Sequence, residues 1–168
     1  MPDLDRDFDP RGLLGTLDRH RVDYIVVGAL ARVIHGAPEV TDELDIVPSL
    51  KGRNPQRLQA AFDDLEATLP RGRAANAETL AESAEPVVRL RTRLGKLAVV
   101  PQPEGTRGYD DLKRAVTREH LGQGLRPQVA SPGDLGRMLA ALRREDDRDK
   151  LRALRRVAEL DLGRGIRR

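Results

Sequence analysis

Glu43 and Asp45 are two acidic residues separated by a single leucine in the segment TDELDIV. If this segment is a β-strand, residues two positions apart point to the same side, so both carboxylates can reach one cation. Mg²⁺ prefers one or two carboxylates together with phosphate oxygens and water. The spacing therefore predicts a site for Mg²⁺ (or Mn²⁺) at Glu43 and Asp45, next to a bound nucleotide.

A glycine turn precedes this acidic pair. The apolar run 22–28 ends at Gly28, and Ala29 opens a segment with helical spacing. Backbone N–H groups at such a strand-to-helix turn can bind phosphate. Together with a divalent ion they would hold a nucleoside triphosphate (NTP) for in-line attack on its α-phosphate. This interpretation predicts Gly28 and Ala29 as nucleotide-binding residues.

Each of these features also has an ordinary structural explanation. Acidic residues at the entry to a strand are commonly solvated, and glycine between a strand and a helix is common in turns. His35, at the end of the expected helix, is more typical of a packed or hydrogen-bonded histidine than of a ligand or a base. The spacing alone therefore leaves a structural role open beside the metal site.

The elements that must position these residues follow from hydrophobic spacing. A β-branched strand over 22–28, a helix over 29–36 and a strand over 43–49 form an α/β unit. Ser131 and Asp134 form a variant of the capping box, which predicts a helix from residue 131. The other expected elements are helices over 11–21, 54–70 and 147–161, a loop with a short helix over 71–85, a hairpin over 86–101 that turns at Leu94 and Gly95, a helix from about residue 109 and a strand over 125–131.

Composition bounds the class of protein. The 168 residues suffice for one domain with a real core but not for two. The chain has no cysteine, which excludes disulfides and thiolate chemistry, and 2% aromatic residues, which predicts an aliphatic core. The net charge of +3 is compatible with a nucleotide or RNA partner. No apolar run approaches the roughly 20 residues that cross a bilayer, so we expect a cytoplasmic protein with no membrane partner.

The order of short motifs resembles that of the polymerase-β-like nucleotidyltransferase family. It is most similar to small bacterial members of the abortive-infection (AbiE-type) kind, which are toxins of toxin–antitoxin pairs. The matching segments span roughly residues 22–160. In chain order they are VVGALA, HGAP, TDELD, RTRLGKLAVVP, GYDDL and VASPGDLGRMLAALRREDDRDKL.

The resemblance implies a fold. It is a mixed β-sheet with helices packed on it (an α/β or α+β fold) and a C-terminal helical segment. The expected domain spans residues 1–168, with the sheet-containing core over 1–120 and a C-terminal strand and helices over 121–168.

The resemblance also implies residue roles. Glu43 and Asp45 would hold Mg²⁺ (or Mn²⁺), and Arg144 would meet the phosphate charge beside Gly28 and Ala29. Asp147, the acid of an Arg-x-x-Asp motif, would orient or deprotonate the nucleophile. The substrate would be an NTP, the acceptor a hydroxyl of tRNA, another RNA or a protein, and the partner a cognate antitoxin.

Several positions depart from the family pattern. Ala29 replaces a second small residue of the turn, often a serine, and Glu39 replaces an arginine. The first metal carboxylate is Glu43, one methylene longer than the usual aspartate. An aspartate of the third strand is Ala98, and a lysine of the penultimate helix is Leu139. The loss of the acid, of the lysine and of the arginine would each remove transition-state stabilisation, about 2 kcal/mol or more apiece.

Two functional hypotheses follow from these departures. In the first, the protein is an Mg²⁺-dependent nucleotidyltransferase in which Asp147 supplies the third acid and Arg137, Arg143 or Lys96 replaces the missing phosphate cation. In the second, it is a catalytically impaired pseudo-nucleotidyltransferase that acts as a binding module for a protein or RNA. A purely structural domain is a third alternative. For Arg143 and Arg144, a solvated helix face is the structural explanation.

Overall fold

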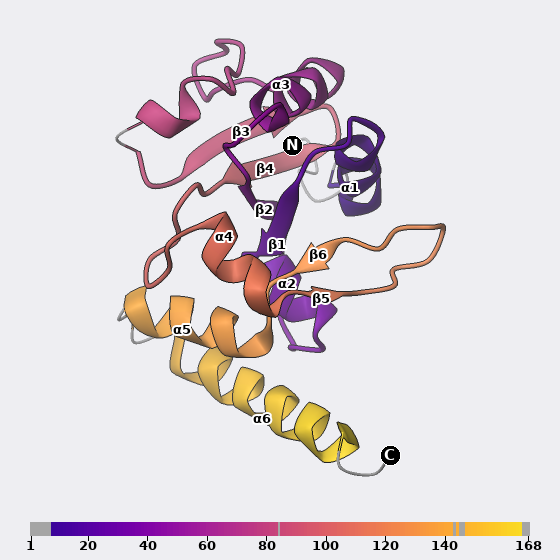
Figure 1. Ribbon diagram of the computed structural model, residues 1–168, viewed down its shortest axis with the longest axis vertical. Coiled ribbons are helices and arrows are strands. Elements are labelled where there is room, and N and C mark those ends of the chain that lie inside the picture. Colours follow the sequence, from indigo (N-terminus) through magenta and orange to yellow (C-terminus); the bar gives the residue numbers. More distant parts are fainter. Residues whose placement is uncertain (1–7, 84, 143, 145–146, 166–168) are drawn as a thin grey trace, which may run out of the picture.

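A computed structural model describes residues 8–83, 85–142, 144 and 147–165. Its helices and strands are connected by loops, with an irregular stretch between α3 and β3 and a long loop between β5 and β6 (Figure 1). In chain order they are α1 (Pro10–Arg19), β1 (Tyr24–Val27), α2 (Gly28–Ile34), β2 (Glu43–Pro48), α3 (Asn54–Asp64), the 3₁₀ turn η2 (Leu80–Glu82), β3 (Val88–Thr92), β4 (Gly95–Val99), α4 (Tyr109–Leu112), the 3₁₀ turn η3 (Lys113–Ala115), β5 (Thr117–Arg118), β6 (Gln128–Val129), α5 (Pro132–Leu142) and α6 (Arg148–Gly165).

The strands form one six-stranded mixed sheet in the order β3-β4-β2-β1-β6-β5. β1 pairs antiparallel with β2, whereas β2 with β4 and β1 with β6 are parallel pairs. The predicted α+β class with a mixed sheet is therefore confirmed. β5 is a strand that hydrophobic spacing does not reveal, because it has two residues and exists through its pairing with β6.

Some predicted bounds are wrong in length. The strand expected over 125–131 shrinks to β6, because only Gln128 and Val129 pair with the neighbouring strands. The helix expected from residue 109 has one turn, α4, and continues as η3. The expected helix over 54–70 ends at Asp64, because Glu66 adopts a left-handed conformation.

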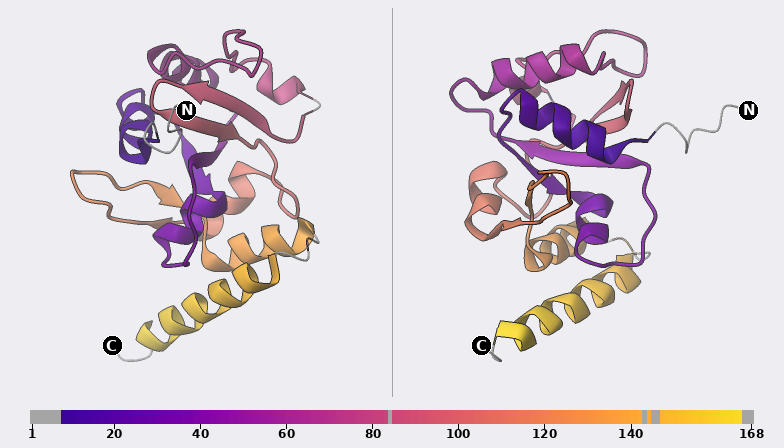
Figure 2. Two further views of the ribbon diagram at one scale, coloured as in Figure 1. Left: turned by 180° about the vertical axis from the view of Figure 1, so that it is seen from behind. Right: turned by 90° about the vertical axis from the view of Figure 1, so that its right-hand side faces the viewer.

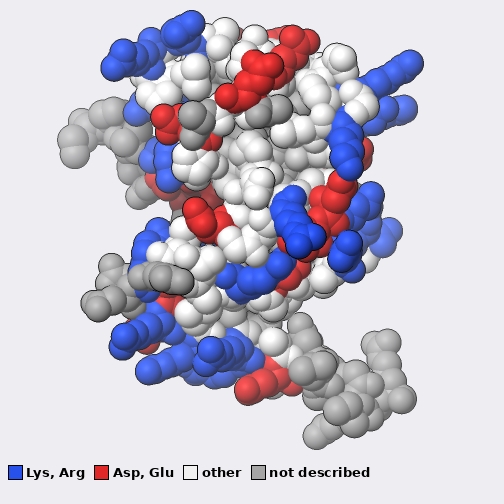
Figure 3. Space-filling model, turned by 60° about the vertical axis from the view of Figure 1, so that its left-hand side comes forward, with Lys and Arg blue, Asp and Glu red and all other residues white. Residues whose placement is uncertain are grey.

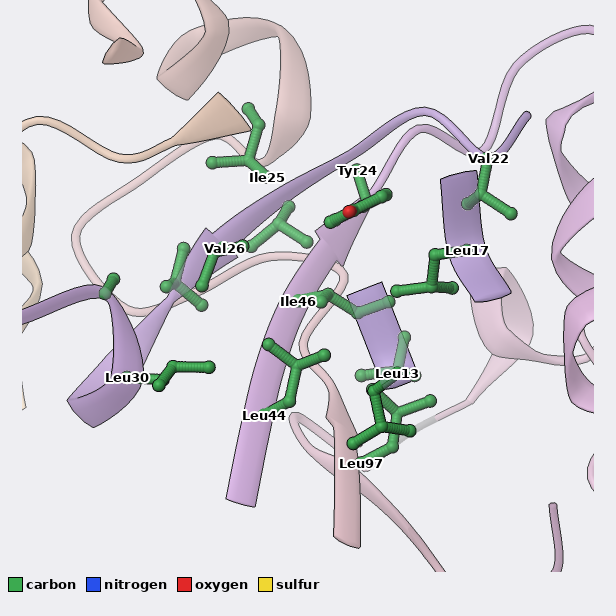
Figure 4. Packing of buried hydrophobic residues seen from close by; sticks show 14 of the residues in the cluster. Leu13, Leu17, Val22, Tyr24, Ile25, Val26, Leu30, Leu44, Ile46 and Leu97 are labelled. Atoms are coloured by element: carbon green, nitrogen blue, oxygen red, sulfur yellow. The ribbon is translucent and has the colours of Figure 1, made fainter. Parts of the chain in front are cut away.

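α1 and α3 cover one face of the sheet. Leu44 and Ile46 of β2 point to this face and pack against Leu13 and Leu17 of α1 (Figure 4). These side chains are fully buried, and Phe62 of α3 is the sole aromatic ring among the largest of the fully buried side chains. The core is therefore aliphatic, as the composition predicts.

The opposite face of the sheet is covered in part by α4 and by the helices that follow β6 (Figures 1 and 2). α5 contacts α2, and α6 lies against α5 at the end of the molecule remote from α1 and α3. The backbone N–H of Asp134 donates to Ser131 Oγ at 3.1 Å, which confirms the predicted cap of α5. Within the described residues, no helix combines the length and apolar character of a membrane span.

Candidate active site

β2 places Glu43 and Asp45 on the sheet face that α1 and α3 leave free. Leu44 and Ile46, between and after them, are buried in the core on the other face. The predicted alternation is therefore confirmed, and the two carboxylates share one side of the strand. Asp45 Oδ1 is buried and has no hydrogen-bond partner among the described residues. A buried carboxylate oxygen without a donor is an available ligand for a cation.

The environment of Asp45 favours its neutral form. Burial is the largest cause, followed by the neighbouring Glu43 carboxylate, and together they raise the pKa of Asp45 to about 8. Arg89 and Arg32 act in the opposite direction with smaller effects. A divalent cation at this carboxylate would supply the positive charge that its surroundings lack.

Gly28 brings the backbone of the β1–α2 turn against Asp45. The φ angle of Gly28 is +71°, in the left-handed region that favours glycine. A Cβ atom on this residue would stand 2.2 Å from Asp45 Oδ2, which is too close for any side chain. The glycine is therefore required both by the turn and by the approach of the carboxylate. Ala29 follows Gly28, and both residues line a cavity together with Asp45.

A cavity of about 380 Å³ opens over these residues, between the sheet and α5. The turn at Gly28 and Ala29 and the Asp45 side chain line one wall. The wall formed by α5 is apolar. Its side chains are Leu135, Met138, Leu139 and Leu142. An acidic centre facing an apolar wall can hold a molecule that has both a charged and a flat apolar part.

The strand register explains what stands beside Asp45. Asp45 pairs with Ala98 of β4, and Ala98 pairs with Arg89 of β3. Directly paired residues point to the same face, so these three side chains form a row across the sheet. Ala98 is thus next to Asp45, at the position where the family resemblance implies an aspartate. Its methyl group cannot bind a metal ion.

Arg89 contacts the acidic pair. Its Nη1 atom lies 2.8 Å from Glu43 Oε1, and its side chain also lines the cavity. The side chain of Glu43 is 20% exposed and that of Arg89 is 62% exposed, so the pair sits at the rim. The sequence alone does not single out Arg89, because its approach to Glu43 depends on the pairing of β3 with β4.

A buried ion pair accounts for Glu39. Arg32 of α2 donates from Nε and Nη2 to the two carboxylate oxygens of Glu39, at 2.6 and 2.9 Å. The side chains are 8% and 12% exposed, and Arg32 lines the cavity. The charge reversal at Glu39 is therefore matched by a cation from the preceding helix. Arg32 is a second residue that the sequence alone does not identify.

Arg144 and Asp147 are close to each other but differ in their access to the cavity. Arg144 lines it, and its Nε donates to Asp147 Oδ2 at 2.8 Å. The side chain of Asp147 is 2% exposed, and Lys150 lies 3.4 Å from its other oxygen. Burial raises the pKa of Asp147, but Arg144 and Lys150 outweigh it, so the pKa lies below its usual range.

The structure does not bring Asp147 together with Glu43 and Asp45. In the part of the chain that is described, no three acidic or histidine side chains gather as a metal-binding group. Glu43 and Asp45, with the free Oδ1 of Asp45, fit one divalent cation with water and phosphate completing its shell. The role of Asp147 toward the nucleophile stays a prediction.

The other cations considered as replacements have acidic partners. Lys96 Nζ lies 2.8 Å from Asp42, and Arg137 pairs with Asp111 and Asp134. Arg143 lies outside the described residues. Leu139, at the position of the expected lysine, is 3% exposed and belongs to the apolar wall. Arg32 of α2 and Arg144, between α5 and α6, therefore line the cavity together with Arg89 of β3.

His35 has a structural position. Its Nε2 donates to the backbone oxygen of Ala130 at 2.8 Å, which connects α2 to the segment after β6. Its side chain is 5% exposed and does not line the cavity. The interpretation of His35 as a packed, hydrogen-bonded histidine is confirmed.

Comparison with known proteins supports the fold. No protein-family model and no curated protein sequence matches this chain. Among solved structures, it is similar to that of a "putative nucleotidyltransferase" from Thermotoga maritima. The TM-score is 0.54 and the sequence identity 16%, over 84% of this chain and 87% of the other. At this identity the likeness concerns the fold, and the chain has a nucleotidyltransferase-like α+β fold.

Proposed function

We propose that the protein is a nucleotidyltransferase that transfers a nucleoside monophosphate from an NTP to a hydroxyl group, in a reaction that depends on Mg²⁺ or Mn²⁺. One observation carries the proposal. It is the acidic pair Glu43 and Asp45 on β2: Asp45 lines a cavity, its Oδ1 has no hydrogen-bond partner among the described residues, and its Oδ2 lies against the Gly28 turn. The fold it shares with the Thermotoga maritima protein is consistent with this activity.

The residues of the cavity divide the work. Asp45 would hold the cation, with Glu43 beside it, and the bound ion would supply positive charge to the triphosphate. Gly28 and Ala29 line the cavity and would offer the backbone of the turn to phosphate. Arg144 reaches the cavity from the α5–α6 side and would balance phosphate charge, while Asp147 fixes the direction of its guanidinium.

The apolar wall of α5 suits the base of the nucleotide. Leu139 and its neighbours offer a flat surface without charge, on which a nucleobase can lie. Because this wall presents few hydrogen-bonding groups, we expect weak discrimination among the four bases. The leucine at position 139 would thus exchange a phosphate contact for a base contact.

The surface of α6, which packs against α5, favours RNA as the acceptor. Between residues 148 and 160, α6 has five Lys or Arg residues and two Asp or Glu residues. Positive side chains gather on the lower part of the molecule, where α6 lies (Figure 3). An RNA backbone is attracted to such a surface by its phosphates. A tRNA acceptor, and control by a cognate antitoxin, are more specific proposals within the same function.

Transfer of label tests the proposal. The purified protein is incubated with each α-³²P-labelled NTP, Mg²⁺ or Mn²⁺, and total tRNA or a protein mixture, beside the variant Asp45→Asn. We expect label in RNA that requires the metal and is lost in the variant. Equal background labelling by both proteins, with all four NTPs and both acceptors, would contradict the proposal.

A second candidate function is a pseudo-nucleotidyltransferase that binds without turnover. Two observations favour it: Ala98 stands beside Asp45 where a third acid would be, and Leu139 takes the place of a phosphate-binding lysine. Thermal unfolding with NTP and Mg²⁺ distinguishes the alternatives when combined with the labelling assay. Stabilisation that requires Asp45, without transfer, favours the binding module.

A further inference from the structure

The Arg89 side chain extends from β3 across the neighbouring strand β4 to reach Glu43 on β2. β4 lies between β3 and β2, and Ala98 is the residue of β4 that separates Arg89 from Asp45 in the register. Ala98 is fully buried and presents one methyl group. With nothing longer at this position, the Arg89 side chain extends over β4 and its guanidinium meets Glu43.

This contact divides the two carboxylates between different cations. A guanidinium keeps its positive charge at any physiological pH, so Glu43 has a permanent counter-ion at 2.8 Å. Asp45 has none at this distance, and its Oδ1 has no donor among the described residues. The same Arg89 side chain lines the cavity above Asp45. The protein therefore supplies the positive charge for Glu43, and the positive charge for Asp45 would come from a bound cation.

We propose that the Arg89 guanidinium, paired with Glu43, takes the place of one metal ion in this site. The site then binds a single divalent ion, at Asp45. The guanidinium also contacts the phosphates of the bound nucleotide. The inference rests on the proposed function for its phosphate contact. Its pairing of Arg89 with Glu43 does not need that function. Arg89 is thus a positioning residue for Glu43 and a binding residue for phosphate.

Electron paramagnetic resonance, which counts bound Mn²⁺ and measures its affinity, tests the pairing of Arg89 with Glu43 and the single metal ion. The full chain is titrated without nucleotide, as wild type and as Arg89→Ala, Arg89→Lys and Arg91→Ala. Arg91 is the matched control, since it is an exposed arginine of the same strand that pairs with Lys96. We expect one Mn²⁺ per wild-type chain and about tenfold tighter Mn²⁺ binding in Arg89→Ala, because Glu43 is released as a ligand. Arg91→Ala should match the wild type.

Nucleotide binding at saturating Mn²⁺ tests the contact between Arg89 and the nucleotide phosphates. With a non-hydrolysable NTP analogue, calorimetry should give about tenfold weaker binding for Arg89→Ala than for Arg91→Ala, and partial recovery in Arg89→Lys. The count of Mn²⁺ at the acidic pair is repeated in the complex, after subtracting ions bound by free nucleotide. Circular dichroism confirms that each variant is folded.

The outcomes separate this inference from the proposed function. Two Mn²⁺ ions per wild-type chain without nucleotide, or equal Mn²⁺ and nucleotide affinities for Arg89→Ala and Arg91→Ala, would overturn the role of Arg89 even if nucleotide binds. Absence of nucleotide binding to the wild type would overturn the proposed function, and with it the phosphate contact. A gain of Mn²⁺ affinity in Arg89→Ala would then still support the pairing with Glu43.

Discussion

The α-carbon of Gly28 faces the carboxylate of Asp45 so closely that a methyl group does not fit between them. Asp45 belongs to β2, and Gly28 is the first residue of α2, directly after Val27, which pairs with Asp45 in the sheet. A Cβ at position 28 would lie 2.2 Å from Oδ2 and 2.9 Å from Cγ of Asp45. The turn thus fixes the position of the carboxylate from behind.

Gly28→Ala should therefore displace Asp45 and abolish Mn²⁺ binding. The change also places alanine at a φ of +71°, which costs about 1 to 2 kcal/mol of unfolding free energy. Gly36→Ala is the matched control, because Gly36 has a φ of +100° and a Cβ atom there would meet no atom of the described residues within 4 Å. Urea unfolding should report a loss of stability in both variants, and Mn²⁺ titration a loss in Gly28→Ala alone. Loss of Mn²⁺ binding in both would contradict the specific contact.

Asp45→Asn should make the protein more stable at alkaline pH. The carboxyl loses its proton near pH 4 in the unfolded chain, but its pKa is raised to about 8 in the folded protein. The folded state therefore binds more protons between these values, and the stability of the wild type falls as pH rises through this window. Asparagine does not titrate, so at pH 9 the variant should exceed the wild type by roughly 2 kcal/mol or more.

Urea unfolding from pH 5 to pH 9 measures this difference. The two curves should diverge as pH rises, and the difference between them should level off as pH approaches 9. Added Mg²⁺ should narrow the gap at pH 9 by stabilising the wild type, since it neutralises the Asp45 carboxylate. A difference that does not change with pH would show that Asp45 titrates normally.

Arg32 and Glu39 should show strong coupling in a double-mutant cycle. Glu39→Met leaves a buried guanidinium without its partner, and we expect a loss of about 3 kcal/mol in unfolding free energy. Arg32→Met leaves Glu39 unpaired and should cost a similar amount. The double variant should lose much less than the sum, because both charges are gone. Additive losses would contradict a buried, mutually dependent pair.

His35→Phe should weaken the fold without affecting the site. It removes the hydrogen bond to Ala130 and leaves that carbonyl without this donor, a loss of about 1 to 2 kcal/mol. His120→Phe is the control, because His120 is exposed. Thermal unfolding should distinguish the two variants, whereas Mn²⁺ affinity should equal that of the wild type in both. A changed Mn²⁺ affinity in His35→Phe would assign His35 to the site.

The sequence predicts the local part of this architecture well. The alternation around Leu44 correctly predicts that Glu43 and Asp45 share a face, and Ser131 correctly predicts the start of α5. These features depend on residues a few positions apart, whose geometry is set by the strand or the helix itself. The overall class follows from the order of such elements.

The partners of the acidic pair could not be predicted in the same way. Arg89 reaches Glu43 because of the register between β3 and β4, and Arg32 meets Glu39 because the loop after α2 folds back. Both contacts depend on tertiary geometry that one sequence does not encode visibly. β5 escapes prediction for the same reason, since its two residues become a strand by pairing with β6.

The short strand β6 has a consequence for association between chains. Its Val129 pairs with Val26 of β1, and the backbone N–H of Ala130 donates to the oxygen of Val26 at 3.0 Å. β1 consists of four buried apolar residues, so without β6 it would present an open hydrophobic edge. Such an edge recruits strands from other molecules. β6, more than 100 positions later in the chain, therefore protects β1, the strand that leads into the Gly28 turn, from pairing with other molecules.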